Sequence, residues 1–340
     1  MSPMSKIETN GQSAGPLLEV HDLSISLGGR ASGLRLVEGI SFALERGEIL
    51  GIVGESGSGK TLVGMSLMRL LMPTLETTGS AIFEGRDLLS VSEREMRRVR
   101  GRHIGMVFQE PVGALNPVFT IGSQISAVLR TQHGMTRRQA RDRTIELLRR
   151  VGIPDPASRL GFYPHQLSGG MCQRVMIAMA LASGAGLLIA DEPTTSLDVT
   201  IQKGIVSLLE DIVREDGISV IFISHDLGLV SQICGRVAVF YSGQVVEMGS
   251  AHDILRYPRH PYTKGLVRCV PNLDAIGVLQ RGIPGTPPTA GQWPAGCRFQ
   301  PRCAEAEGGR CSQPQVMHDL APGHRARCWK AEASLSACAS

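Results

Sequence analysis

The sequence predicts an α/β fold in which helices cover a largely parallel sheet. Short apolar runs such as "GLLIAD" (186–191) and "SVIFISHD" (219–226) have the length of buried strands, and each ends on polar residues. Stretches with apolar residues at helical spacing alternate with these runs, as in "MTRRQARDRTIELLRRVGI" (135–153). Strands that alternate with helices favour a parallel sheet, with polar side chains collected at the carboxyl ends of its strands.

The remaining elements follow from local patterns along the chain. Strands, with their turns, are predicted at 17–27, 37–54 and 79–88, and a hairpin at 236–249. A helix is expected from about Lys60 to Met72, because Pro73 cannot continue it. Residues 92–165 are helical in pattern, and Gly152 is placed to end the last of these helices.

Composition and charge are those of a globular protein, with 42% hydrophobic residues, 19% charged residues and a net charge of +4. No apolar run reaches the roughly 18 residues that a membrane span needs, and residues 1–16 lack the apolar segment of a signal peptide. We therefore expect a flexible arm at 1–16 and a cytosolic chain, whose cysteines are reduced or metal-bound rather than paired. The basic runs at 94–103 and 137–143 favour solvated helix faces over a nucleic-acid patch.

The composition changes after about Pro258, where proline and glycine become frequent. Four cysteines then follow one another closely, at Cys297, Cys303, Cys311 and Cys328. These features predict a separate C-terminal extension over 258–340. Four thiolates can hold an iron–sulfur cluster or a zinc ion, and thiols without a metal can instead pack a small cap. No C-x2-C pair occurs, so the spacing is not that of a zinc ribbon.

A phosphate-binding loop is predicted within "GIVGESGSGKT" (51–61), where G-x-x-x-x-G-K-T follows a strand and opens a helix. The glycines let consecutive backbone N–H groups face phosphate oxygens, and the helix dipole favours the same charge. Lys60 is expected to reach the β- and γ-phosphates, and the Thr61 hydroxyl to hold Mg²⁺. The residues expected to bind nucleotide here are Gly54, Glu55, Ser56, Gly57, Ser58, Gly59, Lys60 and Thr61.

Four polar residues next to strand ends are candidates for hydrolysis of the nucleotide. Asp191 ends a buried run, where a carboxylate can hold Mg²⁺, and Glu192 can orient and partly deprotonate an attacking water. Gln109 follows the run Ile104 to Phe108, and its amide can ligate Mg²⁺ or orient water. His225 closes the next strand, where a neutral imidazole can hydrogen-bond the γ-phosphate or the water.

A second small-residue turn, "LSGGM" (167–171), lies directly ahead of an apolar stretch. The Ser168 hydroxyl and the N–H groups of Gly169 and Gly170 can form another anion cradle at a helix N-terminus. One nucleotide needs one phosphate loop, and residues 54–61 already provide it. The second anion site at 167–171 must therefore have another purpose.

In order and spacing, "GESGSGKT", "VFQEP", "LSGGM", "LLIADEPTTSLD" and "ISHD" resemble the motifs of the ATP-binding subunit of ABC transporters, over about residues 17–260. The resemblance implies an α/β P-loop NTPase of the ABC ATPase type at 17–257, which binds and hydrolyses ATP with Mg²⁺. Such a domain has a mixed sheet core, an antiparallel β subdomain and a helical subdomain, here at about 110–168. The small cysteine-containing extension follows it.

Individual roles carry over to matching residues. By resemblance, 54–61 is the phosphate loop, and the signature runs from Ser168 to Met171. The other implied roles are the Q-loop glutamine Gln109, the Mg²⁺ aspartate Asp191, the catalytic glutamate Glu192, the D-loop aspartate Asp198 and the switch histidine His225. Lys60 and Gln109 join Glu192 and His225 in the expected catalytic set.

The resemblance also answers the question of the second cradle. Subunits of this family dimerise head to tail, so each ATP lies between the phosphate loop of one chain and the signature of the other. The implied partners are a second ATP-binding subunit, identical or paralogous, two transmembrane permease subunits and, indirectly, an extracytoplasmic solute-binding protein. No nucleic-acid partner is expected. The implied location is peripheral, on the cytoplasmic face of the inner or plasma membrane.

Two further stretches sharpen the assignment. "GALNPVFTIGSQI" (113–125) resembles the insert of peptide-import ATPases on which a permease coupling helix docks, and internal packing is its other interpretation. "RYPRHPYTKGL" (256–266) and the cysteines after it resemble the extension of oligopeptide, dipeptide and nickel importer ATPases. Some similar proteins carry a [4Fe–4S] cluster at these cysteines, which favours a cluster over zinc. Dipeptides, oligopeptides, nickel chelates and glutathione all remain open as solutes.

The sequence departs from the family pattern at two places. Met171 stands where glutamine is commonest, but the anion-binding Ser-Gly-Gly is intact, so activity is expected to survive. The stretch "SISLGGRASGLRL" (24–36) has no aromatic residue to stack on the base, which leaves Leu27 or a neighbour to contact it.

Two other functions were weighed. An ABC ATPase that acts on nucleic acid, as in DNA repair, usually carries two ATPase halves and places zinc cysteines inside the ATPase fold. This chain has one half, and its cysteine cluster lies beyond it. A non-catalytic, nucleotide-dependent scaffold is disfavoured because Glu192 and His225 are intact.

Overall fold

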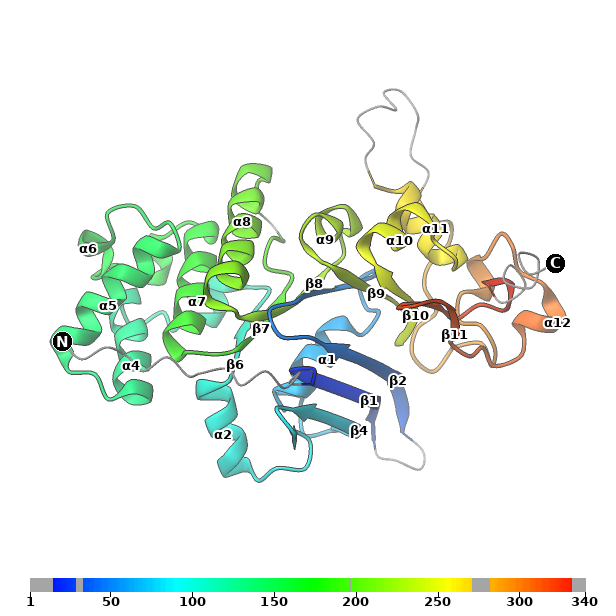
Figure 1. Cartoon of the computed structure of the whole chain (residues 1–340), viewed down its shortest axis with the longest axis horizontal. Helices are drawn as coiled ribbons and strands as arrows, with labels where there is room; N and C mark the ends of the chain where they lie inside the picture. Colours follow the sequence, from blue (N-terminus) through cyan, green and yellow to red (C-terminus); the bar gives the residue numbers. More distant parts are fainter. Residues whose placement is uncertain (1–14, 29–32, 196, 271–281, 332–340) are drawn as a thin grey trace.

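A computed structural model of the chain describes residues 15–28, 33–195, 197–270 and 282–331. All but the last two residues of the arm expected at 1–16 therefore lie outside the described residues. Along the length of the molecule, helices α4 to α6 form one end, strands the middle and the C-terminal segment the other end (Figure 1). None of the helices in the described ranges combines the length and apolarity that crossing a bilayer requires.

An eight-stranded mixed sheet forms the centre, in the order β11-β12-β10-β9-β3-β8-β7-β6. Strands β9, β3, β8, β7 and β6 run parallel, whereas β10, β12 and β11 join antiparallel. Their bounds are β3 Ile49–Val53, β6 Ile104–Val107, β7 Leu187–Asp191, β8 Ser219–Ser224, β9 Arg236–Tyr241, β10 Gln244–Ser250, β11 His318–Ala321 and β12 His324–Ala326. The predicted α/β fold with a mixed sheet core is thus confirmed.

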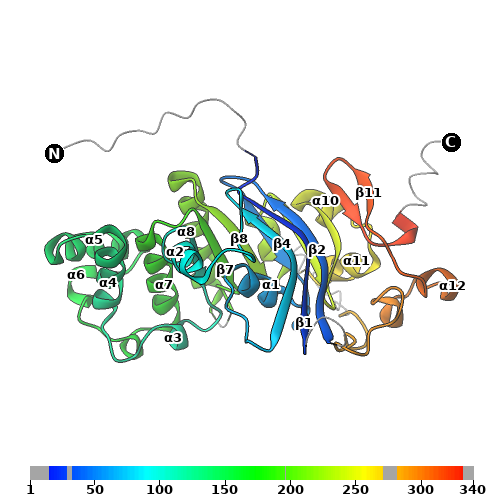
Figure 2. The same cartoon turned by 90° about the horizontal axis from the view of Figure 1, so that it is seen from below.

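A second, four-stranded antiparallel sheet has the order β2-β1-β4-β5. Its strands are β1 Leu18–Leu27, β2 Leu34–Leu44, β4 Leu75–Phe83 and β5 Arg86–Asp87. Figure 2 shows β1, β2 and β4 side by side, close to α1. This sheet is the antiparallel β subdomain that the resemblance implied.

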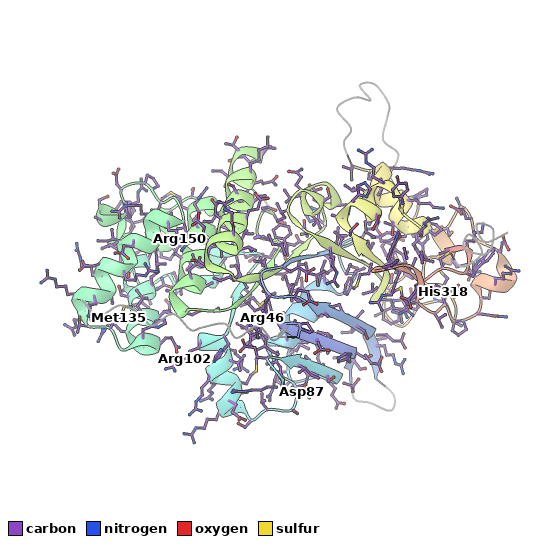
Figure 3. The ribbon with its side chains drawn as sticks, viewed as in Figure 1. Arg46, Asp87, Arg102, Met135, Arg150 and His318 are labelled. Carbon is purple, nitrogen blue, oxygen red and sulfur yellow. The ribbon has the colours of Figure 1, made fainter. Side chains whose placement is uncertain are left out.

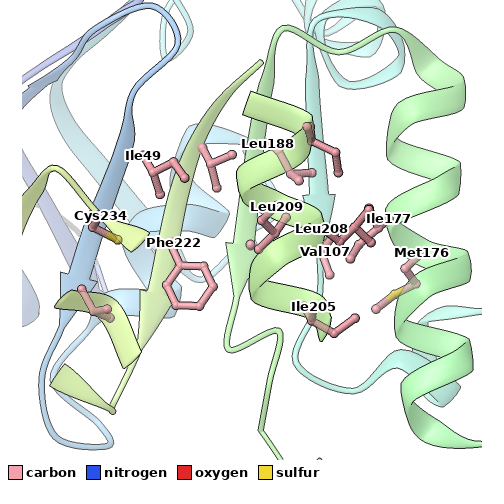
Figure 4. Packing of buried hydrophobic residues seen from close by; sticks show 14 of the residues in the cluster. Ile49, Val107, Met176, Ile177, Leu188, Ile205, Leu208, Leu209, Phe222 and Cys234 are labelled. Atoms are coloured by element: carbon pink, nitrogen blue, oxygen red, sulfur yellow. The ribbon is translucent and has the colours of Figure 1, made fainter. Parts of the chain in front are cut away.

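Apolar residues on the two faces of the main sheet form two cores. On one face, the antiparallel sheet and α1 pack with the strands and share a buried cluster that includes Leu18, Val63 and Ile223. On the other face, Phe222 and Leu188 of the sheet pack with Leu209 of α8 (Figure 4). Burial on both faces explains why the central strands are continuous apolar runs in the sequence.

The helices begin and end where local sequence signals place them. Their bounds are α1 Lys60–Leu67, α2 Glu93–Arg102, α3 Pro111–Ala114, α4 Ile121–His133, α5 Arg137–Arg150, α6 Pro156–Arg159, α7 Gly169–Ser183, α8 Val199–Asp216, α9 Leu227–Ile233, α10 Ala251–Arg256, α11 Pro261–Arg268 and α12 Gly308–Cys311, with short 3₁₀ turns at Pro164–Gln166 and Gln300–Arg302. Ser92 and Thr136 form capping boxes at the N-termini of α2 and α5. Gly134, Gly184 and Gly217 end α4, α7 and α8 in the left-handed conformation.

One helix is shorter than the sequence predicts. Helix α1 ends at Leu67 rather than near Met72, because the backbone of Arg69 takes a φ of 49° before Pro73 is reached. The Leu70 N–H then donates to the Met65 carbonyl, which closes the helix five residues back. A non-glycine residue in the left-handed conformation has no reliable sequence signal. The prediction therefore rested on Pro73 alone, and it placed the end of α1 too late in the chain.

Helices α4 and α5 form the helical end of the molecule, and α7 and α8 connect it to the sheet. Arg150, at the end of α5, pairs with Asp216 at the end of α8 (2.6 Å), and Figure 3 labels this arginine. The side chains of Ser126 on α4 and Thr144 on α5 share a hydrogen bond of 3.0 Å. Polar and ionic contacts therefore supplement the apolar packing between these helices.

The C-terminal extension is continuous with the core, although its composition led us to expect a separate appendage. Its strand β12 pairs with β10 of the hairpin, so the extension adds two strands to the main sheet. Tyr241, Tyr262 and Phe299 pack ring against ring, with centroids 4.6 to 5.4 Å apart. This aromatic cluster joins strand β9 to helix α11 and to the segment that carries Cys297 and Cys303.

Candidate functional site

The loop between β3 and α1 has the geometry of a phosphate cradle. A Cβ atom at Gly54 would lie 2.2 Å from the carbonyl oxygen of Phe240, so only glycine fits there. Gly59 has a φ of 98°, which an L-residue with a side chain rarely adopts. The loop thus turns tightly into the N-terminus of α1, where the helix dipole favours an anion.

Lys60 is buried in this loop, with 4% of its surface exposed. Its Nζ donates to the carbonyl oxygens of Gly54 (2.8 Å) and Glu55 (3.0 Å). Burial lowers the pKa of Lys60, and the nearby carboxylates of Glu192, Asp191 and Glu55 act in the opposite direction. The cation is therefore pre-positioned at the cradle, where an anionic ligand would offset its desolvation.

Thr61 and Asp191 meet across the site. The Thr61 hydroxyl donates to Asp191 Oδ1 at 3.0 Å, and Asp191 is 3% exposed at the end of β7. Burial raises the pKa of Asp191, and the hydrogen bond from Thr61 partly counters this. Mg²⁺ is commonly held by one or two carboxylates together with substrate phosphates and waters. A hydroxyl and a buried carboxylate beside a phosphate cradle fit that ion.

Glu192 connects two other residues singled out in the sequence, Gln109 and His225. Its Oε2 accepts hydrogen bonds from Thr195 Oγ1 (2.7 Å) and Gln109 Nε2 (3.2 Å), and lies 3.2 Å from His225 Nδ1. The backbone of Glu192 has a φ of 45°, a left-handed conformation that is uncommon for a side-chain-bearing residue. A strained turn thus places this carboxylate between Gln109 and His225. Strained backbone conformations of this kind are common at active sites.

Lys60, Thr61, Gln109 and Glu192 border one cavity of about 430 Å³. Asp191 and His225 adjoin it through their contacts with Thr61 and Glu192. Its polar end consists of the phosphate loop with Gln109 and Glu192. Its other end is formed by Leu36 of β2 and by residues of the extension, namely Pro287, Pro288, Thr289, Ala290 and Trp293. These extension residues carry no local sequence signal for such a role, because only the fold brings them to the cavity. Leu36, the last residue of the aromatic-free stretch 24–36, lines the cavity, and Leu27 does not.

The extension also holds the phosphate loop directly. The Arg302 guanidinium forms a bidentate ion pair with the Glu55 carboxylate, with distances of 2.6 and 3.0 Å. The backbone N–H of Glu55 donates to the Tyr262 hydroxyl at 2.9 Å. Two residues of the C-terminal part of the chain thus fix the second residue of the loop.

The predicted signature lies outside this cavity. Ser168 is the N-cap of α7, its hydroxyl accepts from the Met171 N–H at 3.4 Å, and Ser168 and Gly169 are exposed. A Cβ at Gly170 would lie 2.6 Å from Ile201 Cγ2, which explains the glycine there. Asp198 is likewise exposed and caps α8 through the Ile201 N–H at 2.9 Å. The chain therefore brings together Lys60, Thr61, Gln109, Asp191, Glu192 and His225, and leaves Ser168, Gly169, Gly170 and Asp198 apart from them.

The four cysteines Cys297, Cys303, Cys311 and Cys328 border a second, much smaller cavity, of about 10 Å³. Burial raises the pKa of Cys297 to about 11, and raises those of Cys303 and Cys328 as well. Cys311 Sγ accepts hydrogen bonds from the Glu307 N–H and the Trp329 indole, each at 3.4 Å. Within the described ranges, no three His, Cys, Asp or Glu side chains are placed to hold a metal ion. The structure therefore does not support the expected iron–sulfur cluster or zinc site.

Two family models match parts of the chain. A family model described as ABC transporter matches residues 37–195, and one described as the C-terminal region of oligopeptide/dipeptide transporters matches residues 246–311.

Several curated proteins are similar over nearly the whole chain. A putative peptide import ATP-binding protein of Brucella abortus (strain 2308) is 47% identical over 314 residues, which cover 92% of this chain and 94% of that protein. The oligopeptide transport ATP-binding protein OppD of Salmonella typhimurium is 44% identical, with 96% and 98% covered. The dipeptide transport ATP-binding protein DppD of Escherichia coli is 44% identical, with 92% and 96% covered.

Solved structures show the same core fold. The ATP-binding cassette MJ0796, solved as a dimer in a post-hydrolysis state bound to ADP and Pi, matches with a TM-score of 0.62 and 26% identity. The match covers 69% of this chain and 98% of that one. The protein cbiO1 of Clostridium perfringens, part of the cbiONQ transporter complex, matches with a TM-score of 0.60 and 28% identity, with 72% and 96% covered.

Proposed function

The chain belongs to the ABC transporter family, and from this premise we propose that it is the ATP-hydrolysing subunit of a peptide importer. The supporting relatives are peptide, oligopeptide and dipeptide ATP-binding proteins, at 44% to 47% identity over most of the chain. The extension matches the C-terminal region of oligopeptide/dipeptide transporters, which favours a peptide over an unrelated solute.

The observation that carries the proposal is the convergence on one cavity. A buried lysine, a hydroxyl–carboxylate pair and a strained glutamate come from two separate segments of the chain, 60–61 and 191–192. Each type of group suits one part of a nucleoside triphosphate and its attacking water. A chance arrangement of surface residues does not leave a buried Lys60 in the cavity wall and a buried Asp191 hydrogen-bonded to the neighbouring Thr61.

The residues divide the work of hydrolysis between them. Lys60 binds the β- and γ-phosphates, in exchange for its present bonds to the loop carbonyls of Gly54 and Glu55. Thr61 and Asp191 hold Mg²⁺, which supplies positive charge to the phosphate oxygens when it is bound. Glu192 orients the attacking water and accepts its proton. Gln109 and His225, both within 3.2 Å of Glu192 Oε2, keep that carboxylate in place.

The exposed signature supports a nucleotide site that is shared between two chains. Ser168 and Gly169 are accessible at the start of α7, and neither lines the cavity of their own chain. In a head-to-tail pair, the signature of one chain would close the phosphate end of the cavity of the other. The similar cassette MJ0796 was solved as a dimer. The second ATP-binding subunit is either an identical chain or a paralogue.

The segment around α3 supports a permease contact. Val112, Val118 and Phe119 are 51%, 70% and 54% exposed, and they follow Gln109 within ten residues of the chain. Three exposed apolar side chains on one short segment suit a partner that buries them. We assign this surface to the permease, with the chain on the cytoplasmic face of the membrane and the solute-binding protein on the other side. The alternative function on nucleic acid has no support from the relatives named above.

Hydrolysis by the purified chain, alone and reconstituted with its permease, tests the function. Glu192→Gln should lower the rate of ATP hydrolysis by about a hundredfold or more, because the water loses its general base. ATP affinity should change little, since the amide keeps the shape of the side chain. Glu210→Gln, an exposed position on α8, is the matched control and should hydrolyse normally. Full activity of Glu192→Gln, or hydrolysis without any effect on labelled peptide uptake, would contradict the proposal.

A further inference from the structure

Among the described residues, the apolar end of the nucleotide cavity is lined by one aromatic side chain, that of Trp293 in the C-terminal extension. The sequence stretch 24–36, where an aromatic residue was expected to stack on the base, has none. We propose that Trp293 binds the base of ATP, so that the extension supplies the base subsite of the nucleotide site in its own chain. This inference rests on the proposed ATPase function and adds the residue that holds the base.

The cavity has two chemically different ends, as a nucleoside triphosphate has. Lys60, Thr61, Gln109 and Glu192 line the end at the start of α1. The opposite end is mostly apolar, with the side chains of Leu36, Pro287, Pro288, Ala290 and Trp293. A volume of about 430 Å³ lies within the range of small-ligand pockets. A ligand whose phosphates occupy the first end must extend its other half toward the second.

Trp293 also lies close enough to the phosphate loop for one ligand to reach both. A Cβ on Gly243 would lie 2.9 Å from Trp293 Cη2. The N–H of Gly243 in turn donates to the carbonyl of Ser58, in the phosphate loop, at 2.9 Å. Gly243, in the hairpin turn between β9 and β10, therefore lies between the indole and the phosphate loop.

The ring of Trp293 is held in place before any ligand binds. The Arg298 guanidinium lies over the ring, 3.5 Å from its centroid. Arg298 is itself buried, donates to the Ser242 carbonyl and pairs with Glu38. A side chain that is already fixed loses little entropy when it binds a ligand.

Arg298 also indicates which face of the indole is left for the base. Trp293 separates the nucleotide cavity from a neighbouring one, which Arg298 and Arg327 line but the phosphate loop does not. The arginine thus covers the ring from the side of that neighbouring cavity. The side toward the nucleotide cavity remains for a second flat group. Stacking of this kind accepts any base, since every base has a π face.

The indole N–H of Trp293 is a further feature of this side chain. Trp293 Nε1 is buried and has no hydrogen-bond partner within the described part of the chain. Buried tryptophan N–H groups usually find a partner. Trp329, which borders the small cavity lined by the four cysteines, follows that rule, since its indole N–H donates to Cys311 Sγ. The two tryptophans therefore differ, since the indole N–H of Trp293 is unpaired among the described residues and that of Trp329 is paired.

The test compares ligands that do and do not carry a base, by calorimetry on the full chain in the Glu192→Gln background, where ATP stays intact. Trp293→Ala should weaken MgATP and MgGTP binding by about tenfold or more and leave magnesium tripolyphosphate binding unchanged. Trp293→Phe should recover most of the loss, because it restores an aromatic face. Trp329→Phe, the other tryptophan of the chain, is the matched control and should bind both ligands normally.

The outcomes separate this inference from the function on which it rests. Failure of the parent chain to bind ATP would contradict the ATPase proposal itself. Normal ATP binding by Trp293→Ala, or an equal loss of ATP and tripolyphosphate, would overturn the base subsite alone. Thermal unfolding of each variant checks that the wall has not collapsed. If the alanine variant is unstable, Trp293→Leu, which keeps an apolar side chain without an aromatic face, should show the same selective loss of ATP binding.

Discussion

The two ends of the nucleotide cavity are built in different ways. The phosphate end comes from one continuous loop, 54–61, and from residues at the carboxyl ends of neighbouring strands. The base end comes from Leu36 of β2 and from residues 287–293, which lie far apart in the sequence. Local backbone geometry therefore specifies the first end, and only tertiary packing of the extension specifies the second.

The two ends are nevertheless joined through the extension. Arg302 pairs with Glu55 at the phosphate end, and Arg298 stacks on Trp293 at the base end. Between these two arginines, Phe299 packs into the cluster of Tyr241 and Tyr262. One short segment of the extension thus contacts both ends, and the comparison can be tested by changing one end at a time.

The largest effect should follow removal of the cation at the phosphate end. Lys60→Ala should weaken ATP and tripolyphosphate alike, by about a hundredfold or more, because charged hydrogen bonds to the phosphates are lost. Calorimetry with the two ligands measures this. Lys203→Ala, an exposed lysine of α8, is the control. A loss confined to ATP would contradict the division of the cavity into two ends.

The next effect concerns the buried carboxylate Asp191. Asp191→Asn should slow hydrolysis by about tenfold to a hundredfold, because a neutral amide holds Mg²⁺ less well. The control is Asp211→Asn, at an exposed position of α8. Unchanged magnesium dependence of hydrolysis in Asp191→Asn would contradict the assigned role.

Asp191 also predicts a pH dependence of stability without nucleotide. Its pKa in the folded chain is raised by burial, so the ionised form destabilises the fold at neutral pH. That cost disappears as the pH falls below the pKa of the unfolded chain. The free energy of unfolding of Asp191→Asn should therefore exceed that of the parent chain at neutral pH and approach it in acid. Denaturant titrations at several pH values would show this convergence, and parallel curves would refute it.

A smaller effect is expected from the link between the ends. Arg302→Ala leaves the partly buried carboxylate of Glu55 without its partner and should lower the free energy of unfolding by about 2 kcal/mol. Affinity for ATP and tripolyphosphate should fall together by about threefold to tenfold, since the loop is less well held. Arg325→Ala, whose pairing with Asp319 at 3.9 Å is exposed, is the control. Unchanged affinity would show that the extension does not support the loop.

The smallest effect in the isolated chain should come from the signature. Ser168→Ala should leave ATP affinity of the single chain within about twofold, because Ser168 does not line its cavity. The same variant should slow hydrolysis once the ATPase pair is assembled with its permease. Thr136→Ala removes a comparable helix cap, on α5, and controls for helix stability. An affinity loss in the single chain would show that the signature acts within its own chain.

The sequence was sufficient for the phosphate end and for most of the fold. Gln109, Asp191, Glu192 and His225 each follow or end a recognisable strand, so parallel pairing brings them to one edge of the sheet. Trp293 was missed because its position depends on β12 pairing with β10 and on the aromatic packing around Phe299. Neither contact has a local signal in the chain. The same absence of local signals explains why the extension was expected to be a separate appendage.

The most direct test of the base subsite uses the fluorescence of a single tryptophan. The chain contains two tryptophans, so the Trp329→Phe variant emits from Trp293 alone. Because an indole responds to a base stacked on it, MgATP should quench or shift this emission in a saturable way, while magnesium tripolyphosphate bound to the same site should change it far less. Emission that stays constant while calorimetry shows ATP bound would contradict the account.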